Sequence, residues 1–183
     1  KHRDAYSAKH ITVLEGLDPV RRRPSMYIGS IDQHGLNQLA AEVIDNAMDE
    51  AVEGAATKID ILLDEDFYLT VSDNGRGIPV DKHPKFKNKT ALEVIMTTLH
   101  AGAKFSDKVY GTSGGLHGVG ISVVNALSDD LIVEVAREGK VWMHKYCRGK
   151  LIKRLAAQPK KNRRGTKVRF HPDPKIFGDK TKF

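Results

Sequence analysis

The segment from Gly35 to Glu53 has the most regular pattern of apolar and polar positions in the chain. Its apolar residues recur every three or four positions, which is the spacing of one face of an α-helix. They are Leu36, Leu39, Ala40, Val43, Ala47 and Ala51. The pattern predicts one long amphipathic helix over this segment.

The rest of the chain predicts two further helices, at residues 90–100 and 119–127, and a set of short strands. The strand-like runs are rich in β-branched and aromatic residues and end at turn residues. They cover residues 58–63, 67–71, 131–137, 141–147, 151–155 and 166–170. We therefore expect an α+β fold, a two-layer sandwich in which helices cover one face of a mixed, largely antiparallel sheet.

Length and composition are those of one globular domain. The chain has 183 residues, of which 40% are hydrophobic and 29% charged, so it can bury a core of its own. We expect an N-terminal arm at residues 1–12 and one domain at 13–183, and the abrupt end at Phe183 suggests a piece of a longer polypeptide.

No apolar stretch approaches the roughly 20 residues of a membrane span, and the single Cys147 cannot form an internal disulfide. These features favour a cytoplasmic location without membrane contact.

The formal net charge of +7 is unevenly distributed along the chain. One basic block is Arg21 to Arg23, and a second extends from Lys150 to Arg169. Such blocks can bind nucleic acid, although most charge runs are only solvated surface. A basic nucleic-acid-binding module therefore stays open as one possible function.

The polar face of the long predicted helix is unusually acidic. On a helical wheel it consists of Glu42, Asp45, Asn46, Asp49 and Glu53. Leu36 to Glu53 contains five carboxylates and no Lys or Arg, and like charges one turn apart repel one another. Either this face is simply exposed to solvent, or it is a site whose positive charges come from elsewhere. Those charges would be arginines of the fold or a divalent metal ion. Glu42 and Asn46 lie one turn apart, so one could act on a water while the other holds Mg²⁺.

An aspartate stands at the end of the strand at 67–71, in the run Asp73-Asn74-Gly75-Arg76-Gly77-Ile78-Pro79. The run can be a plain tight turn. Alternatively, Asp73 could accept a hydrogen bond from an exocyclic amine such as that of adenine. Ile78, Pro79 and Ile95 would then supply apolar walls.

The segment from Gly111 to Gly120 contains five glycines in ten residues and precedes the apolar run 121–127. It is either a flexible loop with a helix cap or a backbone cradle for phosphate, with Lys104 adding positive charge. It matches neither the P-loop pattern nor the dinucleotide-binding turn. A nucleotide site here would be of another kind.

In their order and spacing, the segments 42–47, 73–79 and 115–120, with Gly165-Thr166 downstream, resemble the Bergerat-type ATP site. This site is shared by gyrase, Hsp90, histidine kinases and MutL, the GHKL ATPases. Residues 20–29, 99–105 and 113–127 are more closely similar to the ATPase domain of bacterial type IIA topoisomerase B subunits. The resemblance extends from Tyr6 to about Pro174. It implies an ATP-hydrolysing enzyme domain that dimerises on binding ATP and gates the passage of DNA strands.

The resemblance also implies roles for individual residues. Glu42 would be the general base that polarises the attacking water, Asn46 the Mg²⁺ ligand, and Asp73 the acceptor for the adenine amine. Thr166 and a water beside Gly77 would complete recognition of the base. The other residues implied in ATP binding are Tyr6 (from the partner in a dimer), Glu50, Arg76, Ile78, Pro79, Lys104, Tyr110, Gly115, Leu116, His117, Gly118, Val119, Gly120 and Ile121. The outer pocket for the family's aminocoumarin inhibitors would consist of Asp73, Arg76, Arg137 and Thr166.

The implied partners are ATP, a second copy of the chain, the topoisomerase A subunit and DNA. The sequence departs from the family where Gln38 replaces a histidine one turn before the general base, and also at Ser25, Ala103 and Gly111. The family's catalytic lysine belongs to a following transducer domain that is not part of this sequence. The runs 21–24, 161–166 and 171–173 favour the B subunit of topoisomerase IV over that of gyrase. A histidine kinase or chaperone ATPase with the same fold is less consistent with the segment 99–105.

Overall fold

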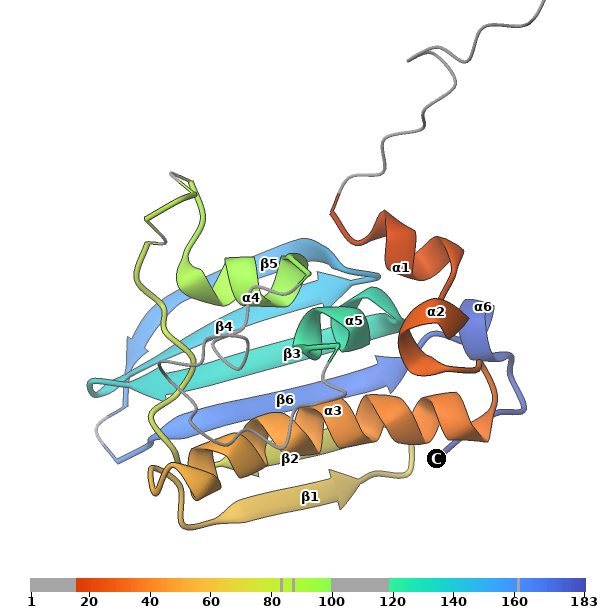
Figure 1. Ribbon diagram of the computed structural model, residues 1–183. Coiled ribbons are helices and arrows are strands. Elements are labelled where there is room, and N and C mark those ends of the chain that lie inside the picture. Colours follow the sequence, from red (N-terminus) through yellow and green to blue (C-terminus); the bar gives the residue numbers. More distant parts are fainter. Residues whose placement is uncertain (1–15, 83, 87, 100–118, 161) are drawn as a thin grey trace, which may run out of the picture.

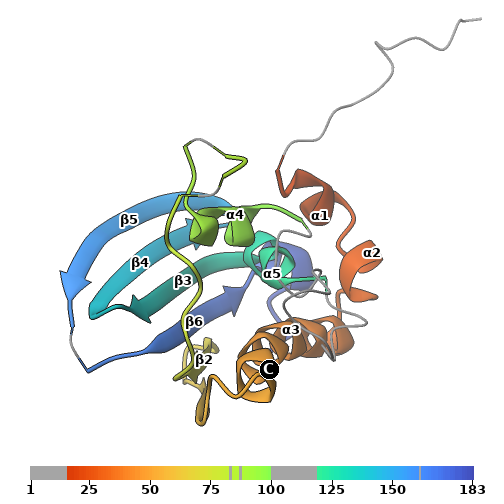
Figure 2. The same ribbon diagram turned by 60° about the vertical axis from the view of Figure 1, so that its left-hand side comes forward.

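A computed structural model describes residues 16–82, 84–86, 88–99, 119–160 and 162–183. These residues form a two-layer structure in which a twisted sheet carries its main helices on one face (Figures 1 and 2). The predicted α+β sandwich is therefore confirmed. Among the described residues, no helix has the length and apolarity that crossing a membrane requires.

The sheet has six strands in the order β1-β2-β6-β3-β4-β5. All of its pairings are antiparallel. The strands are β1 (Ile59–Leu63), β2 (Leu69–Asp73), β3 (Ser128–Arg137), β4 (Lys140–Cys147), β5 (Lys150–Pro159) and β6 (Gly165–Pro172). Because β6 lies between β2 and β3, the start of β6 meets the end of β2, and this places Thr166 beside Asp73.

Three helices cover the sheet: α3 (Gln33–Val52), α4 (Ala91–Thr97) and α5 (Ile121–Ala126). They correspond to the three predicted helices, with shorter bounds for the second and third. The sequence did not predict the short helices α1 (Asp18–Arg22), α2 (Ser25–Ile28) and α6 (Pro174–Phe177).

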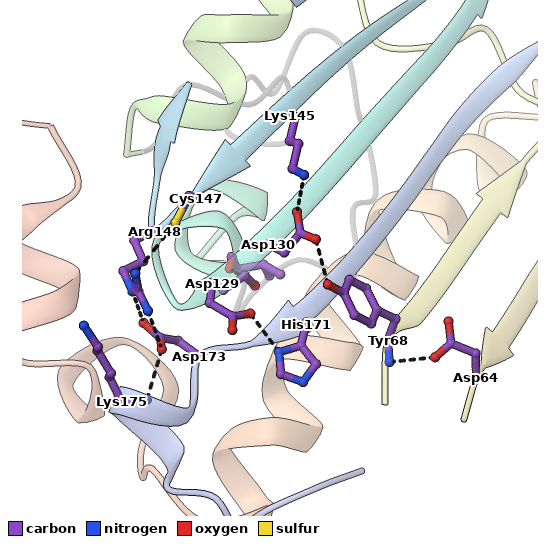
Figure 3. A network of polar contacts seen from close by, with 12 residues as sticks. Asp64, Tyr68, Asp129, Asp130, Lys145, Cys147, Arg148, His171, Asp173 and Lys175 are labelled. Atoms are coloured by element: carbon purple, nitrogen blue, oxygen red, sulfur yellow. Dashed lines mark hydrogen bonds and ion pairs between the residues drawn. The ribbon is translucent and has the colours of Figure 1, made fainter. Parts of the chain in front are cut away.

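The core lies between the sheet and α3. Val133 of β3 and Phe170 of β6 are fully buried, as are Leu36 and Leu39 of α3. On β6, Arg169 and His171 alternate with buried residues and project from the opposite face of the sheet. There His171 contacts Asp129 (Figure 3), and Arg169 lies over the ring of Tyr68.

The polar face of α3 is not a uniformly solvated stripe. Asp45 and Glu53 are exposed, but Glu42 and Asp49 are only 1% and 8% exposed. The helical wheel identified the surface that packs on the sheet. It did not show that a second surface, which includes Glu42, is covered by other parts of the chain.

A buried carboxylate joins the short helices α1 and α6 to the rest of the molecule. Asp173, at the start of α6, is fully buried and accepts hydrogen bonds of 2.8 Å from Arg21 and from Arg148 (Figure 3 draws the second). Burial alone would raise the pKa of Asp173, but the bonds from Arg148, from the Lys175 amide and from Arg21 outweigh it and lower the pKa. Arg21 also donates to the Ala126 carbonyl. This member of the first basic block is therefore a structural residue.

We expect His144 to make the free energy of unfolding depend on pH between 6.5 and 4. His144 is 3% exposed and contacts the Tyr146 hydroxyl, and burial, assisted by the charge of Arg154, lowers its pKa from 6.5 to about 4. As the pH falls, the unfolded chain takes up this proton first, so the folded state loses about 3 kcal/mol across the window. Denaturant unfolding of His144→Phe should therefore show a weaker pH dependence than the wild type.

The matched control is His34→Phe, which replaces an exposed histidine. It should keep the pH dependence of the wild type. An unchanged pH dependence in His144→Phe would contradict the assignment.

Candidate functional site

Asp73, the last residue of β2, points its carboxylate at backbone amides. Its Oδ1 atom accepts from the amide N–H of Gly75 at 2.8 Å and from that of Thr166 at 3.4 Å. Burial raises the pKa of Asp73, the two amides oppose this, and the nearby charge of Glu50 adds to the increase. Asp73 is thus a half-buried acceptor at the junction of β2 and β6.

The turn after β2 is fitted closely against β6 and β3. The Ile78 amide donates to the Thr166 hydroxyl at 3.1 Å. A Cβ at Gly165 would lie 1.9 Å from the Asp73 carbonyl oxygen, and Gly165 has φ +116°. Gly77, at φ +80°, would place a Cβ 2.8 Å from the Arg137 side chain. Only glycine fits at these two positions.

Glu50 of α3 fixes the same turn from the helix side. Its carboxylate accepts from the backbone amide of Arg76 at 2.9 Å and from the Arg76 guanidinium at 2.7 Å. Burial raises the pKa of Glu50, but the hydrogen bonds and charge of Arg76 outweigh this and lower it. Arg76 thus pairs with Glu50 and is a cation that α3 receives from elsewhere in the fold.

Glu42 lies two turns earlier on α3, against the start of α5. Its Oε1 atom accepts from the Val119 amide, and its Oε2 atom from the Gly120 amide, both at 3.2 Å. The side-chain amide of Gln38 also donates to Oε1, at 3.3 Å. The buried carboxylate therefore has three neutral donors.

Asn46 lies midway between Glu42 and Glu50 on α3 and is half-buried. Residues 42, 46 and 50 project from nearly the same side of the helix, and at 1.5 Å per residue the two glutamates are about 12 Å apart along its axis. No group of three or more His, Cys, Asp or Glu side chains that could hold a metal occurs among the described residues. The donor set fits a Mg²⁺ ion that takes one amide oxygen from the protein and its other ligands from water and phosphate.

A cavity of about 420 Å³ opens beside the Asp73 turn. It is lined by Arg76, Arg137, Glu138, Gly139, Arg163 and Arg164. Arg137 donates to the Gly77 carbonyl at 2.8 Å, so its guanidinium reaches the predicted base-binding turn. In the sequence, Arg163 and Arg164 are only part of a run of charged residues. Their position just before Gly165-Thr166 was the signal that could have identified them as residues of this cavity.

The structure brings together the predicted residues at the Asp73 turn, at Thr166 and on α3. Ile78 and Ile121 are buried, Pro79 is exposed, and Ile95 is half-buried against the core. Seven predicted site residues lie outside the described residues, namely Tyr6, Lys104, Tyr110, Gly115, Leu116, His117 and Gly118. Of the predicted glycine cradle, the described part is Val119, Gly120 and the first turn of α5.

The fold and the arrangement of α3 against the Asp73 turn define a GHKL-type ATPase domain. Residues 31–176 match the family described as histidine kinase-, DNA gyrase B-, and HSP90-like ATPase. The chain belongs to this family.

Individual relatives confirm the closer resemblance to type IIA topoisomerase B subunits. The chain is 59% identical over 184 residues to the B subunit of DNA topoisomerase 4 from Bartonella bacilliformis, covering 100% of this chain and 27% of that protein. It is 53% identical over 176 residues to the B subunit of DNA gyrase from Thermotoga maritima, covering 96% of this chain and 28% of that protein. The chain thus spans about a quarter of the length of these curated relatives.

A solved structure shares the fold. It is the 43K ATPase domain of Thermus thermophilus gyrase B in complex with an aminocoumarin, with a TM-score of 0.77 and 44% identity. The match covers 91% of this chain and 42% of that chain.

We expect Gly165→Ala to destabilise the domain by about 3 kcal/mol or more, because the new methyl group would overlap the Asp73 carbonyl at a φ that disfavours L-residues. Gly139→Ala is the matched control, since Gly139 also has positive φ but nothing within 4 Å of the Cβ that alanine would add. It should cost only about 1 kcal/mol. Equal losses in urea unfolding would refute the close approach at Gly165.

Proposed function

We propose that this chain is the ATP-binding and ATP-hydrolysing domain of a type IIA DNA topoisomerase B subunit. In the whole protein, ATP-driven dimerisation through the N-terminal arm would gate DNA strand passage together with the A subunit. The relatives support this proposal, and we favour topoisomerase IV because its B subunits reach 59% identity to this chain, compared with 53% for the gyrase B relative. The B subunit of gyrase is the alternative.

The observation that carries the proposal is the geometry of α3. One side of this helix brings Glu42 to the start of α5 and Glu50 to the Asp73 turn, about 12 Å apart. This separation suits a nucleoside triphosphate whose base lies at Asp73 and whose phosphates lie at the amides of Val119 and Gly120. Backbone amides at a helix start suit phosphate oxygens.

Base recognition would depend on Asp73 and Thr166. No donor from the residues that the structure describes bonds to Asp73 Oδ2, so this atom can accept from the exocyclic amine of adenine. The Thr166 hydroxyl is held by the Ile78 amide, which leaves its own proton for a ligand or a water. Ile78 and Pro79 would flank the base, and Arg76 and Arg137 would line the outer pocket for aminocoumarins.

Hydrolysis would depend on the placement of a water between Glu42 and the terminal phosphate. Glu42 would accept a proton from this water, and no covalent nucleophile is needed. Asn46 would hold Mg²⁺, which supplies charge to the phosphate oxygens when it is bound with ATP. The roles of Tyr6, Lys104, Tyr110 and residues 115–118 in closing the site remain part of this proposal.

A nucleic-acid-binding module without ATPase activity is less well supported. Arginines in both basic blocks form ion pairs with acids of the fold. The pairs are Arg21 with Asp173, Arg154 with Glu93, Arg163 with Glu134, and Arg169 with Asp64. These side chains therefore serve internal contacts, and the two basic blocks present fewer unpaired arginines to DNA than their sequence suggests.

We expect a non-hydrolysable ATP analogue at millimolar concentration to raise the Tm of the wild type by several degrees, and only with Mg²⁺ present.

Asp73→Asn should weaken binding of the analogue about tenfold or more, because an amide can present its own donor to the adenine amine. Asp60→Asn, which changes an exposed aspartate on the edge strand β1, is the control and should bind like the wild type. The absence of any shift in the wild type would eliminate the ATP site.

In the full-length protein, Glu42→Ala should abolish ATP turnover, with a loss of at least about 100-fold, while analogue binding stays close to that of the wild type. Asp45→Ala removes an exposed carboxylate of the same helix and should leave both quantities unchanged. A parallel loss of binding and turnover in Glu42→Ala would argue against a general-base role.

A further inference from the structure

Asn74, the residue that follows Asp73, ties the candidate site to the segment between α3 and β1. Its Oδ1 atom accepts from the backbone amides of Thr57 and Lys58, at 2.8 and 3.0 Å. Its Nδ2 atom donates to the Thr57 hydroxyl at 2.8 Å, and its backbone amide donates to the Lys58 carbonyl at 3.3 Å. Four hydrogen bonds therefore fix this one residue.

These contacts lie where the pairing of β1 with β2 ends. The final pair is Ile59 with Asp73, so the side chain of Asn74 continues the contact between the two strands by one position. The segment that it holds is fixed to α3 in turn, because the Glu50 carbonyl accepts from the backbone amides of residues 55 and 56 at 2.9 Å. The end of β2 is thus tied to the end of α3.

Asp73 depends on this backbone for the direction of its carboxylate. Its Oδ1 atom is held by the Gly75 amide at 2.8 Å, so the carboxylate follows the path that residues 73–75 take. Glu50 fixes this path on the side of the helix, through the Arg76 amide. A second contact is needed on the side of β1, because one contact leaves the turn free to rotate.

We propose that Asn74 supplies this contact and is a positioning residue for Asp73. It fixes the backbone beside Asp73, so that Oδ2 lies where it can accept from the exocyclic amine of the base. Asn74 thereby sets the preference for adenine over a purine without that amine. The inference rests on the proposed function, because it concerns recognition of the same base.

The position of these hydrogen bonds makes them more important for geometry than for stability. Thr57 and Lys58 are exposed, so water can bond to their amides when the Asn74 side chain is removed, and the domain should stay folded. Water does not hold the two segments at a fixed distance. The expected consequence of losing the side chain is therefore a misplaced Asp73 in a folded protein.

The test uses the full-length protein and compares ATP with purine riboside 5′-triphosphate, which has hydrogen in place of the exocyclic amine. The wild type should prefer ATP about tenfold or more in kcat/KM, the usual gain from a hydrogen bond to a charged group. Asn74→Ala should lose at least about threefold of this preference, through a higher KM for ATP. Its KM for the purine riboside substrate and both kcat values should stay within about twofold of the wild type.

A conservative variant and a matched control accompany Asn74→Ala. Asn74→Asp keeps an oxygen for the amides of Thr57 and Lys58, and the Thr57 hydroxyl can turn to donate to its second oxygen. It should keep most of the preference for ATP. Asn37→Ala removes an exposed asparagine of α3 that accepts from Gln33 at 3.3 Å, and it should match the wild type with both substrates.

The outcomes separate this inference from the proposed function. If the wild type does not hydrolyse ATP, the proposed function fails and the inference fails with it. If the wild type hydrolyses both triphosphates equally well, base recognition by Asp73 is wrong, and so is a residue that positions it.

Other outcomes concern Asn74 alone, in a wild type that shows the expected preference for ATP. An equal rise of both KM values in Asn74→Ala would overturn the positioning role, because the loss would then be a general loosening of the site. An unchanged preference in Asn74→Ala would overturn it as well. So would an equal loss in Asn74→Asp, since the contact to the two amides would not be the property that matters.

Discussion

The burial of the Glu42 carboxylate is the interaction on which the candidate site depends. A charge that is 1% exposed is costly unless donors replace its water. The amides at the start of α5 provide these donors, and in doing so they fix the distance between α3 and α5. The same helix meets the Asp73 turn through Glu50, so one rigid element sets the position of both ends of the site.

The second constraint is the approach of β6 to the end of β2. Antiparallel pairing brings Ser72 opposite Lys167, and the missing side chain at Gly165 then lets the two backbones meet beyond the last paired residues. As a result Thr166 lies beside Asp73 although the two residues are far apart in sequence. The order of the strands in the sheet therefore brings the proposed base-binding residues together. No local pattern in the sequence shows this order.

Prediction from sequence succeeded where a pattern repeats and failed where burial depends on tertiary contacts. The 3.6-residue period identified α3, and β-rich runs between turn residues identified the six strands. The periodicity could not show that Glu42 is buried, because α5 covers it from outside the helix. Helices of four or five residues, such as α1, α2 and α6, are too short to show a period. Of these, α1 and α6 depend on the buried Asp173 and its two arginines, whereas α2 buries Ile28 in the core.

The acidic residues of the site differ in what neutralises them, and this difference separates structural from functional roles. Glu50 is paired with the Arg76 guanidinium, which satisfies its charge within the protein. Asp73 and Glu42 are held by backbone and side-chain amides, which are neutral and whose positions are fixed by the fold. An amide orients a carboxylate but leaves its negative charge uncompensated, so a ligand that brings a donor or a cation gains more at these two positions than at Glu50. The residue type alone does not separate these three carboxylates, and only their donors in the fold show which of them remain available to a ligand.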